Sequence, residues 1–160
     1  MVIRPAAEHD RTAVWEVLEP MIRAGETYPL PRSMSEADGL AYWFDRGHEV
    51  FVADEDGRIS GSYYLRANQD GGGAHVANCG YVTAPAARGR GIGRAMCAHS
   101  LAHATLRGFR AMQFNFVVSS NGAAVRLWQS CGFAIVGRLP GAFQHPSAGY
   151  VDALVMFRAL

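Results

Sequence analysis

Residues 82–94 read VTAPAARGRGIGR, and this stretch decides how the rest of the chain is interpreted. An apolar strand ends at Thr83, glycines alternate through a turn at positions 89, 91 and 93, and a helical segment follows. Glycine has no Cβ, so backbone N–H groups in such a turn can approach an anion, and the helix N-terminus adds partial positive charge. Arg88, Arg90 and Arg94 supply fixed positive charge suited to a pyrophosphate. The stretch therefore predicts a phosphate-binding loop.

Three other interpretations of this loop compete. A dinucleotide fingerprint needs GxGxxG and an acidic residue on the next strand, whereas this chain has GxGxG and no Asp or Glu in 111–118. A P-loop needs Gly-Lys-Ser/Thr, which the loop lacks. A plain glycine-rich turn with solvated arginines stays open.

The pattern on either side of the loop predicts a mixed α/β fold with one central sheet and no second domain over residues 1–160. Apolar alternation, helical spacing and glycine stops predict the order βααββ, then βαβαββ. The expected strands are Val2–Pro5, Val50–Ala53, Ile59–Leu65, His75–Thr83, Ala111–Val118, Phe133–Gly137 and Tyr150–Phe157. The expected helices span about 13–22, Ser35–Arg46, the segment from the glycine loop to Arg107, and Asn121–Cys131.

Composition excludes several classes. The formal net charge of +1 gives no argument for nucleic acid or an anionic membrane as a partner. The odd cysteine count (Cys79, Cys97, Cys131) and the lack of CxxC spacing argue against a disulfide framework and a metal site. The start MVIRPAAEHD turns polar at once, and no apolar run approaches the roughly 20 residues of a membrane span. We therefore expect a cytoplasmic protein without a bound metal.

Two motifs together resemble the GCN5-related N-acetyltransferase (GNAT) superfamily. Arg88-Gly-Arg-Gly-Ile-Gly93 resembles its Q/R-x-x-G-x-G/A pyrophosphate loop. About thirty residues later, Asn121-Gly-Ala-Ala-Val-Arg-Leu-Trp128 and the following Gly132-Phe133 resemble its N-x-x-A-x-x-L-Y-x-x-x-G-F helix. The element order fits along nearly the whole chain. The resemblance implies a mostly antiparallel sheet with one parallel, splayed pair of strands, about four helices, and acetyl-CoA as cosubstrate.

The resemblance also implies cofactor roles for particular residues. The pantetheine arm is expected between strands 75–83 and 111–118, near Val82 and Thr83, with the acetyl carbonyl close to a backbone N–H at Tyr81–Val82. The phosphates are expected on the loop, and Asn121 on the pantetheine, although Asn121 is equally natural as a helix N-cap. The cofactor-binding residues expected in this way are Val82, Thr83, Arg88, Gly89, Arg90, Gly91, Ile92, Gly93, Arg94, Asn121 and Trp128.

Trp128 departs from the family pattern. The family often has a tyrosine at this position, to which protonation of the departing thiolate is usually assigned. An indole N–H donates a hydrogen bond but does not give up its proton near neutral pH. We therefore assign no general acid, because a thiolate is already a good leaving group.

The residue that takes the proton of the attacking amine stays open. The candidates are Glu26, His75, Tyr81, His145 and Asp152, or a water relay. The implied mechanism is direct transfer in a ternary complex, without an acetyl-enzyme.

Two asparagines lie inside otherwise apolar strands, in HVANCGYV and MQFNFVV. Asparagine is depleted in strands, and a buried amide must satisfy its donors and its acceptor. Asn78 and Asn115 are therefore candidates, with Tyr81, for a catalytic role and for acceptor binding, or they satisfy bulged backbone where the strands splay. These segments, with SSN and the tail LPGAF...GYVDALVM, resemble acetyltransferases of proline analogues such as azetidine-2-carboxylate.

Two loops can close the acceptor pocket. Gly25–Pro31 offers the hydroxyls of Thr27 and Tyr28 as substrate contacts, and Arg32 just beyond it can meet a carboxylate. The same segment also suits a rigid connector between helices. The second loop is expected at Gly141–Gly149.

The predicted activity is thus acetylation of a small-molecule amine, with acetyl-CoA as the donor. The alternatives are a protein or peptide N-acetyltransferase, which needs an open groove, and a catalytically silent acetyl-CoA-binding module, which Trp128 favours. The family resemblance also allows a homodimer, for which the sequence itself contains no direct sign.

Overall fold

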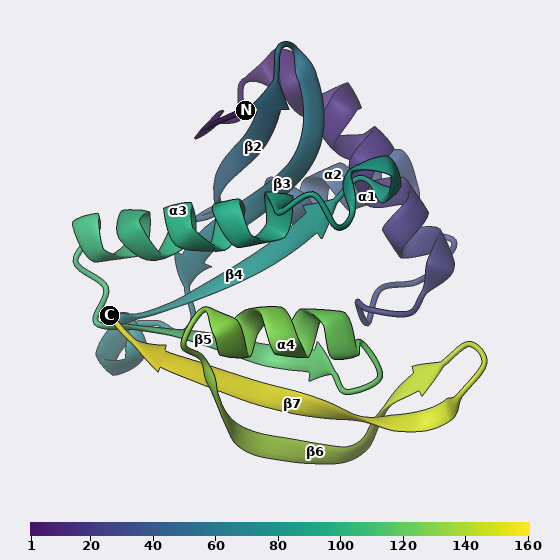
Figure 1. Cartoon of the computed structure of the whole chain (residues 1–160), viewed down its shortest axis with the longest axis vertical. Helices are drawn as coiled ribbons and strands as arrows, with labels where there is room; N and C mark the ends of the chain where they lie inside the picture. The colour runs from purple at the N-terminus through teal and green to yellow at the C-terminus, as the bar shows by residue number, and fades with distance from the viewer.

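The computed structural model describes all 160 residues and contains one seven-stranded sheet with the strand order β1-β2-β3-β4-β5-β7-β6 (Figure 1). Every neighbouring pair is antiparallel except β4 and β5, which are parallel. The strands are β1 (Val2–Pro5), β2 (Glu49–Glu55), β3 (Arg58–Ala67), β4 (Val76–Thr83), β5 (Ala111–Val118), β6 (Ala134–His145) and β7 (Gly149–Ala159). The α-helices are α1 (Arg11–Ala24), α2 (Glu36–Trp43), α3 (Ile92–Leu106) and α4 (Gly122–Ser130). This arrangement confirms the predicted fold class.

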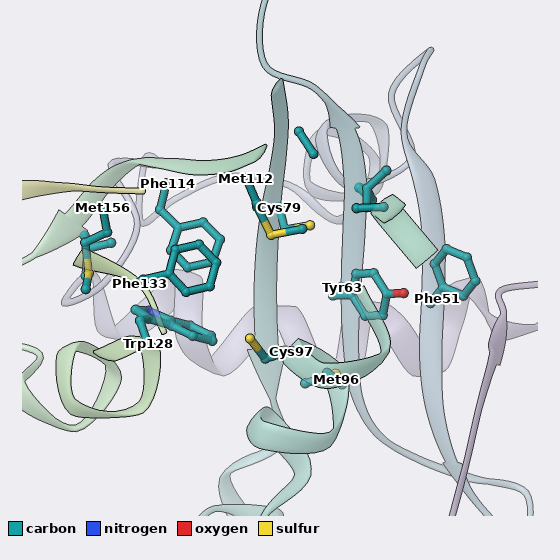
Figure 2. Packing of buried hydrophobic residues seen from close by; sticks show 14 of the residues in the cluster. Phe51, Tyr63, Cys79, Met96, Cys97, Met112, Phe114, Trp128, Phe133 and Met156 are labelled. Atoms are coloured by element: carbon teal, nitrogen blue, oxygen red, sulfur yellow. The ribbon is translucent and has the colours of Figure 1, made fainter. Parts of the chain in front are cut away.

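The helices cover the two faces of the sheet in pairs. Helices α3 and α4 lie on one face, over β4 and β5, and α1 and α2 lie on the other (Figure 1). Beneath α3 and α4, the buried side chains of Met96, Phe114 and Trp128 belong to one apolar cluster (Figure 2). Beneath α1 and α2, Leu18 and Trp43 belong to a second cluster. Each face therefore has its own core, and the sheet separates them.

Local chemistry sets the end of α1 and the start of α2 where the sequence predicts, whereas α2 ends at Trp43 and not at the predicted Arg46. Gly25 follows α1 with φ 65°, a left-handed conformation that glycine adopts without a Cβ penalty. The Ser35 hydroxyl accepts a hydrogen bond from the Asp38 N–H at 3.1 Å and so caps α2. These two ends define the connector between α1 and α2.

The last hairpin differs from the prediction. Strand β6 runs from Ala134 to His145, so most of the expected loop Gly141–Gly149 is strand, and only a short turn joins β6 to β7. Two register shifts, between Ile135 and Gly137 and between Leu139 and Phe143, interrupt the pairing with β7. Such bulges admit a proline at an edge strand, which explains why Pro140 does not end β6.

Candidate active site

The parallel strands β4 and β5 pair only at their first residues. Val76 pairs with Ala111 and Ala77 with Met112, and beyond this point the two strands diverge (Figure 1). Asn78 lies at the point of divergence, where its Nδ2 donates to the backbone carbonyl of Gln113 at 2.8 Å. The Asn78 amide therefore satisfies a backbone carbonyl of β5 at the point where the strand pairing stops. This agrees with the interpretation that Asn78 satisfies backbone groups where the strands splay.

A cavity of about 790 Å³ occupies the wedge between the strands. It is lined by residues of the α1–α2 connector, β3, β4, the glycine loop, β5, α4 and the end of β6. Every residue predicted to contact the cofactor or the acceptor lines this cavity except Arg90 and Arg32. Two groups of elements thus line the same cavity. One is the glycine loop with α4, and the other is the α1–α2 connector with β3.

The glycine loop forms the end of the cavity beside α3. Gly89 and Gly91 have φ values of 76° and 83°, which side-chain-bearing residues rarely adopt. Arg88 and Arg94 line the cavity, and Arg94 Nη2 also donates to Ser130 Oγ of α4 at 3.0 Å. Backbone N–H groups at the start of α3 and two guanidinium groups are what a pyrophosphate requires.

Arg90 lies outside the cavity, unlike the other residues of the glycine loop that were predicted to bind phosphate. Its guanidinium donates two hydrogen bonds to the carboxylate of Glu55, at 2.8 and 3.2 Å, and does not line the cavity. The side chain therefore joins the loop to the end of β2, a contact that sequence spacing cannot reveal.

Helix α4 supplies two further residues to the same region. Asn121 Oδ1 accepts from the Ala124 N–H at 3.2 Å, so this residue caps its own helix and also lines the cavity. The Trp128 ring packs against Tyr81 and Phe114, with centroid distances of 4.9 and 5.1 Å. The indole thus forms part of the cavity wall beside β4 and β5.

The second asparagine belongs to a polar cluster on the opposite face of the sheet from α3 and α4. Asn115 Nδ2 donates to Asn68 Oδ1 at 2.7 Å, and Asn115 Oδ1 accepts from Gln113 Nε2 at 2.9 Å. Asn68, between β3 and β4, was not predicted, because a lone asparagine beside a glycine-rich turn carries no site signal. The cluster fixes the orientation of Asn115 at the cavity wall.

The connector between α1 and α2 reaches the wedge through Tyr28. The Tyr28 hydroxyl accepts a hydrogen bond from the Tyr81 N–H at 2.8 Å and donates to the Tyr81 carbonyl at 3.2 Å. Burial raises the pKa of Tyr28 well above its ordinary value, so the hydroxyl keeps its proton at neutral pH. The connector is therefore attached directly to the backbone of β4.

The Tyr81 side chain points away from this contact. Its phenol lies 2.6 Å from Ser100 Oγ of α3, and Ser100 in turn donates to the carbonyl of Cys97. Burial raises the pKa of Tyr81 well above the ordinary value. The phenol is therefore no proton acceptor near neutral pH, and the backbone of Tyr81 is the part that faces the wedge.

The other candidate bases separate by position. Glu26 and His145 line the cavity, whereas His75 and Asp152 do not. Asp152 accepts hydrogen bonds from Arg138 at 2.6 Å and from the Gly141 N–H at 2.9 Å, and these donors lower its pKa.

His145 Nδ1 accepts from the backbone N–H groups of residues 147 and 148, each at 3.2 Å, so a neutral imidazole carries its proton on Nε2. Glu26 is the only carboxylate that lines the cavity.

Arg66 lines the cavity and was not predicted as a site residue. It lies on β3 directly opposite Asn78 of β4, and its guanidinium makes no ion pair or hydrogen bond within the protein. By contrast, Arg32 donates through Nε to the Arg23 carbonyl at 2.8 Å and lines a separate hollow of about 520 Å³ between the connector and the β6–β7 hairpin. The pairing register of β3 and β4 is the signal that identifies Arg66.

Comparisons with known proteins agree with this geometry. Residues 13–133 match the acetyltransferase (GNAT) family. The N-acetyltransferase aca1 of Schizosaccharomyces pombe is 28% identical over 84% of this chain and 72% of its own length. The L-methionine sulfoximine/L-methionine sulfone acetyltransferase of Salmonella typhimurium is 28% identical over 88% of this chain and 84% of its own length.

A solved structure agrees more closely still. The GCN5-related N-acetyltransferase from Kribbella flavida superimposes with a TM-score of 0.93 at 40% identity, covering 99% of this chain and 97% of that one. None of the helices combines the length and the apolar composition of a membrane span. The chain belongs to the acetyltransferase (GNAT) family and is an acetyl-CoA-dependent N-acetyltransferase.

Proposed function

We propose that the acceptor is a small amino or imino acid, of the proline-analogue type represented by azetidine-2-carboxylate. The observation that carries this proposal is the unpaired guanidinium of Arg66 on the cavity wall, directly opposite Asn78. A partly buried cation without a partner is costly, and a carboxylate of the acceptor would compensate it with a bidentate pair.

The other charge in this part of the cavity has the opposite sign. Glu26 makes no ion pair or hydrogen bond within the protein and is the only carboxylate on the wall. An amino acid in water carries an ammonium and a carboxylate, so Arg66 and Glu26 are complementary to both of its charges. We assign Glu26 to bind the ammonium group and to take its proton, because the amine attacks only in its neutral form.

Neutral groups would orient the acceptor between these charges. Asn78 uses Nδ2 for the Gln113 carbonyl, and its Oδ1 accepts no hydrogen bond within the protein and stays available for the amine. Asn115, held by Asn68 and Gln113, and the hydroxyl of Thr27 complete the proposed acceptor site.

The cofactor half follows the family pattern. We propose that Arg88, Arg94 and the N–H groups of residues 89–93 hold the phosphates. Asn121 would bind the pantetheine beside the backbone of Val82 and Thr83, and Trp128 would border the thioester. In the transfer, the amine nitrogen bonds to the acetyl carbon as the C–S bond breaks. CoA departs as a thiolate, and the amine loses one proton.

The relative from Salmonella typhimurium supports an amino-acid acceptor, because both of its named substrates are derivatives of methionine with an amine and a carboxylate. A peptide N-terminus is the second candidate. The hollow of about 520 Å³ favours it, because this hollow shares Tyr28, Pro29 and His145 with the main cavity and could admit further residues.

The test is release of free thiol from acetyl-CoA in the presence of matched amines. The panel pairs azetidine-2-carboxylate with azetidine, proline with pyrrolidine and methionine sulfone with its methyl ester, and adds short peptides. Saturable release with the free acids, and at least tenfold lower kcat/KM without the carboxylate, is the expected result. Equal rates with azetidine and its acid, or release with peptides alone, would overturn the proposal.

A further inference from the structure

The contact between Tyr28 and the backbone of Tyr81 involves groups that the sheet leaves free. At the end of the β3–β4 ladder, the Ala84 N–H donates to the Ser60 carbonyl at 2.9 Å. Hydrogen-bonded pairs alternate along an antiparallel ladder, so the N–H and C=O of Tyr81, opposite Tyr63, point away from β3. They face the wedge, where β5 has already diverged, and the Tyr28 hydroxyl is their only partner.

The neighbouring residue shows that the chain leaves room for this hydroxyl. A Cβ on Gly80 would lie 2.8 Å from the Tyr28 hydroxyl and 2.4 Å from the Tyr64 ring. The absence of a side chain at Gly80 thus permits Tyr28 to reach the backbone. The Tyr28 ring also lies beside the Trp43 ring of α2, at a centroid distance of 6.3 Å.

We propose that Tyr28 is a catalytic residue whose O–H donates to the acetyl oxygen of acetyl-CoA, together with the N–H of Tyr81. In the structure, the Tyr28 oxygen accepts the hydrogen bond that this N–H would otherwise offer to a carbonyl in the wedge. When the acetyl oxygen takes over that N–H, the phenol needs only a small shift to turn its own O–H from the Tyr81 carbonyl to the same oxygen.

The chemistry explains why two donors matter at this point. Attack by the amine forms the C–N bond and moves the carbonyl π pair onto oxygen, and collapse returns that pair as the C–S bond breaks. Donors placed beforehand stabilise the transient negative charge without further reorganisation. Because Tyr28 keeps its proton at neutral pH, it can serve as a donor throughout, and it is neither the base nor the acid of the reaction.

The central experiment compares wild type with Tyr28→Phe. Loss of one such donor lowers kcat by about 100-fold, while KM for the acceptor changes less. Infrared spectra of bound acetyl-CoA labelled with ¹³C at the carbonyl give a readout without turnover. The carbonyl band is expected at lower frequency on wild type than on Tyr28→Phe. The matched control is Tyr150→Phe, an exposed tyrosine of β7 at 74% relative exposure.

Two outcomes would overturn the assignment. If Tyr28 only blocks the site, Tyr28→Phe will bind acetyl-CoA more tightly and keep its kcat. If it only anchors the connector, Tyr28→Phe will lower the melting temperature, weaken CoA and acetyl-CoA equally and leave the carbonyl band unchanged.

A second variant avoids the loss of the hydroxyl altogether. Fluorotyrosine at position 28 keeps the shape and makes the O–H a stronger donor, so the carbonyl band should move to still lower frequency. An unchanged band would also refute the proposal. The infrared readout needs no acceptor, so its outcome is independent of whether the acceptor carries a carboxylate.

Discussion

Arg66 and Asn78 lie directly opposite each other on β3 and β4, and both line the same cavity. Opposite residues of an antiparallel pair have Cβ atoms about 4.5–5.5 Å apart, so the two side chains can contact one small ligand. The amide of Asn78 is already oriented by the Gln113 carbonyl, whereas the guanidinium of Arg66 has no protein partner. This pairing places a free cation beside an oriented amide, and the acceptor specificity we propose depends on it.

Replacing Arg66 tests the carboxylate contact. Arg66→Gln should raise KM for an amino-acid acceptor by about 10- to 100-fold, because hydrogen bonds to a charged group contribute about 1.5–3 kcal/mol each. Initial rates at varied acceptor and acetyl-CoA concentrations measure the effect, and KM for acetyl-CoA should stay the same. Arg107→Gln is the matched control, since Arg107 pairs with Glu49 away from the cavity. A similar rise in KM for an amine without a carboxylate would contradict the assignment.

Replacing Glu26 tests the proposed proton acceptor. Glu26→Gln should lower kcat by about 100-fold, the lower range for loss of a general base. The deficit should shrink as the pH rises, because a larger fraction of the free amine is then already neutral. Glu16→Gln, at an exposed position on α1 outside the cavity, should behave as wild type. A kcat within twofold of wild type at pH 7 would assign the proton to water instead.

Replacing different arginines of the glycine loop should affect acetyl-CoA binding to different extents, because only some of them line the cavity. Arg88→Ala should raise the Kd for acetyl-CoA by about tenfold, because a charge-assisted contact to phosphate is lost. Arg90→Ala should change it by less than about threefold, since an exposed pair such as Arg90–Glu55 contributes little. Isothermal titration with acetyl-CoA measures both variants under one condition. Equal losses in the two would show that charge in the loop matters more than side-chain position.

The N-terminal ion pairs should make stability depend on acid pH. Arg4 donates to both carboxylate oxygens of Asp10, at 2.7 and 2.9 Å, and to Asp54 at 2.9 Å. These contacts lower the pKa of Asp10 from 3.8 to about 2. A pKa lowered by folding stabilises the protein above the unfolded value, so this contribution is lost as the pH falls from about 4 towards 2.

Asp10→Asn isolates this contribution. At pH 7 it should lower the free energy of unfolding by about 1–2 kcal/mol, a reduced figure because Arg4 is partly exposed and keeps Asp54. Urea titrations at pH 7 and pH 3 should show a smaller loss at pH 3. Glu8→Gln, at a position where the side chain is 89% exposed, serves as control. An equal loss at both pH values would mean that the carboxylate charge is not responsible.

The sequence predicted most elements correctly, and the exceptions have local causes. Strands β1 and β5 begin and end at the predicted residues. Strand β6 was predicted too short, because Gly137, Pro140 and Gly141 normally end strands. In this chain, hydrogen bonding to β7 keeps these residues in the strand, and the bulges accommodate the residues that do not fit the regular pairing. Long-range pairing thus overrode a local signal.

The family, the glycine loop and the order of elements could all be predicted from the amino-acid sequence. These depend on local properties, such as the left-handed conformations of Gly89 and Gly91 or the Asn121 cap, which a few adjacent residues specify. The folded chain was needed to show that Arg66 lies opposite Asn78 and that Arg90 pairs with Glu55. It also brought the Tyr28 hydroxyl to the backbone of Tyr81, 53 residues away in the chain. Such contacts depend on strand register and on how the α1–α2 connector packs against β4, and no periodicity within one segment encodes either.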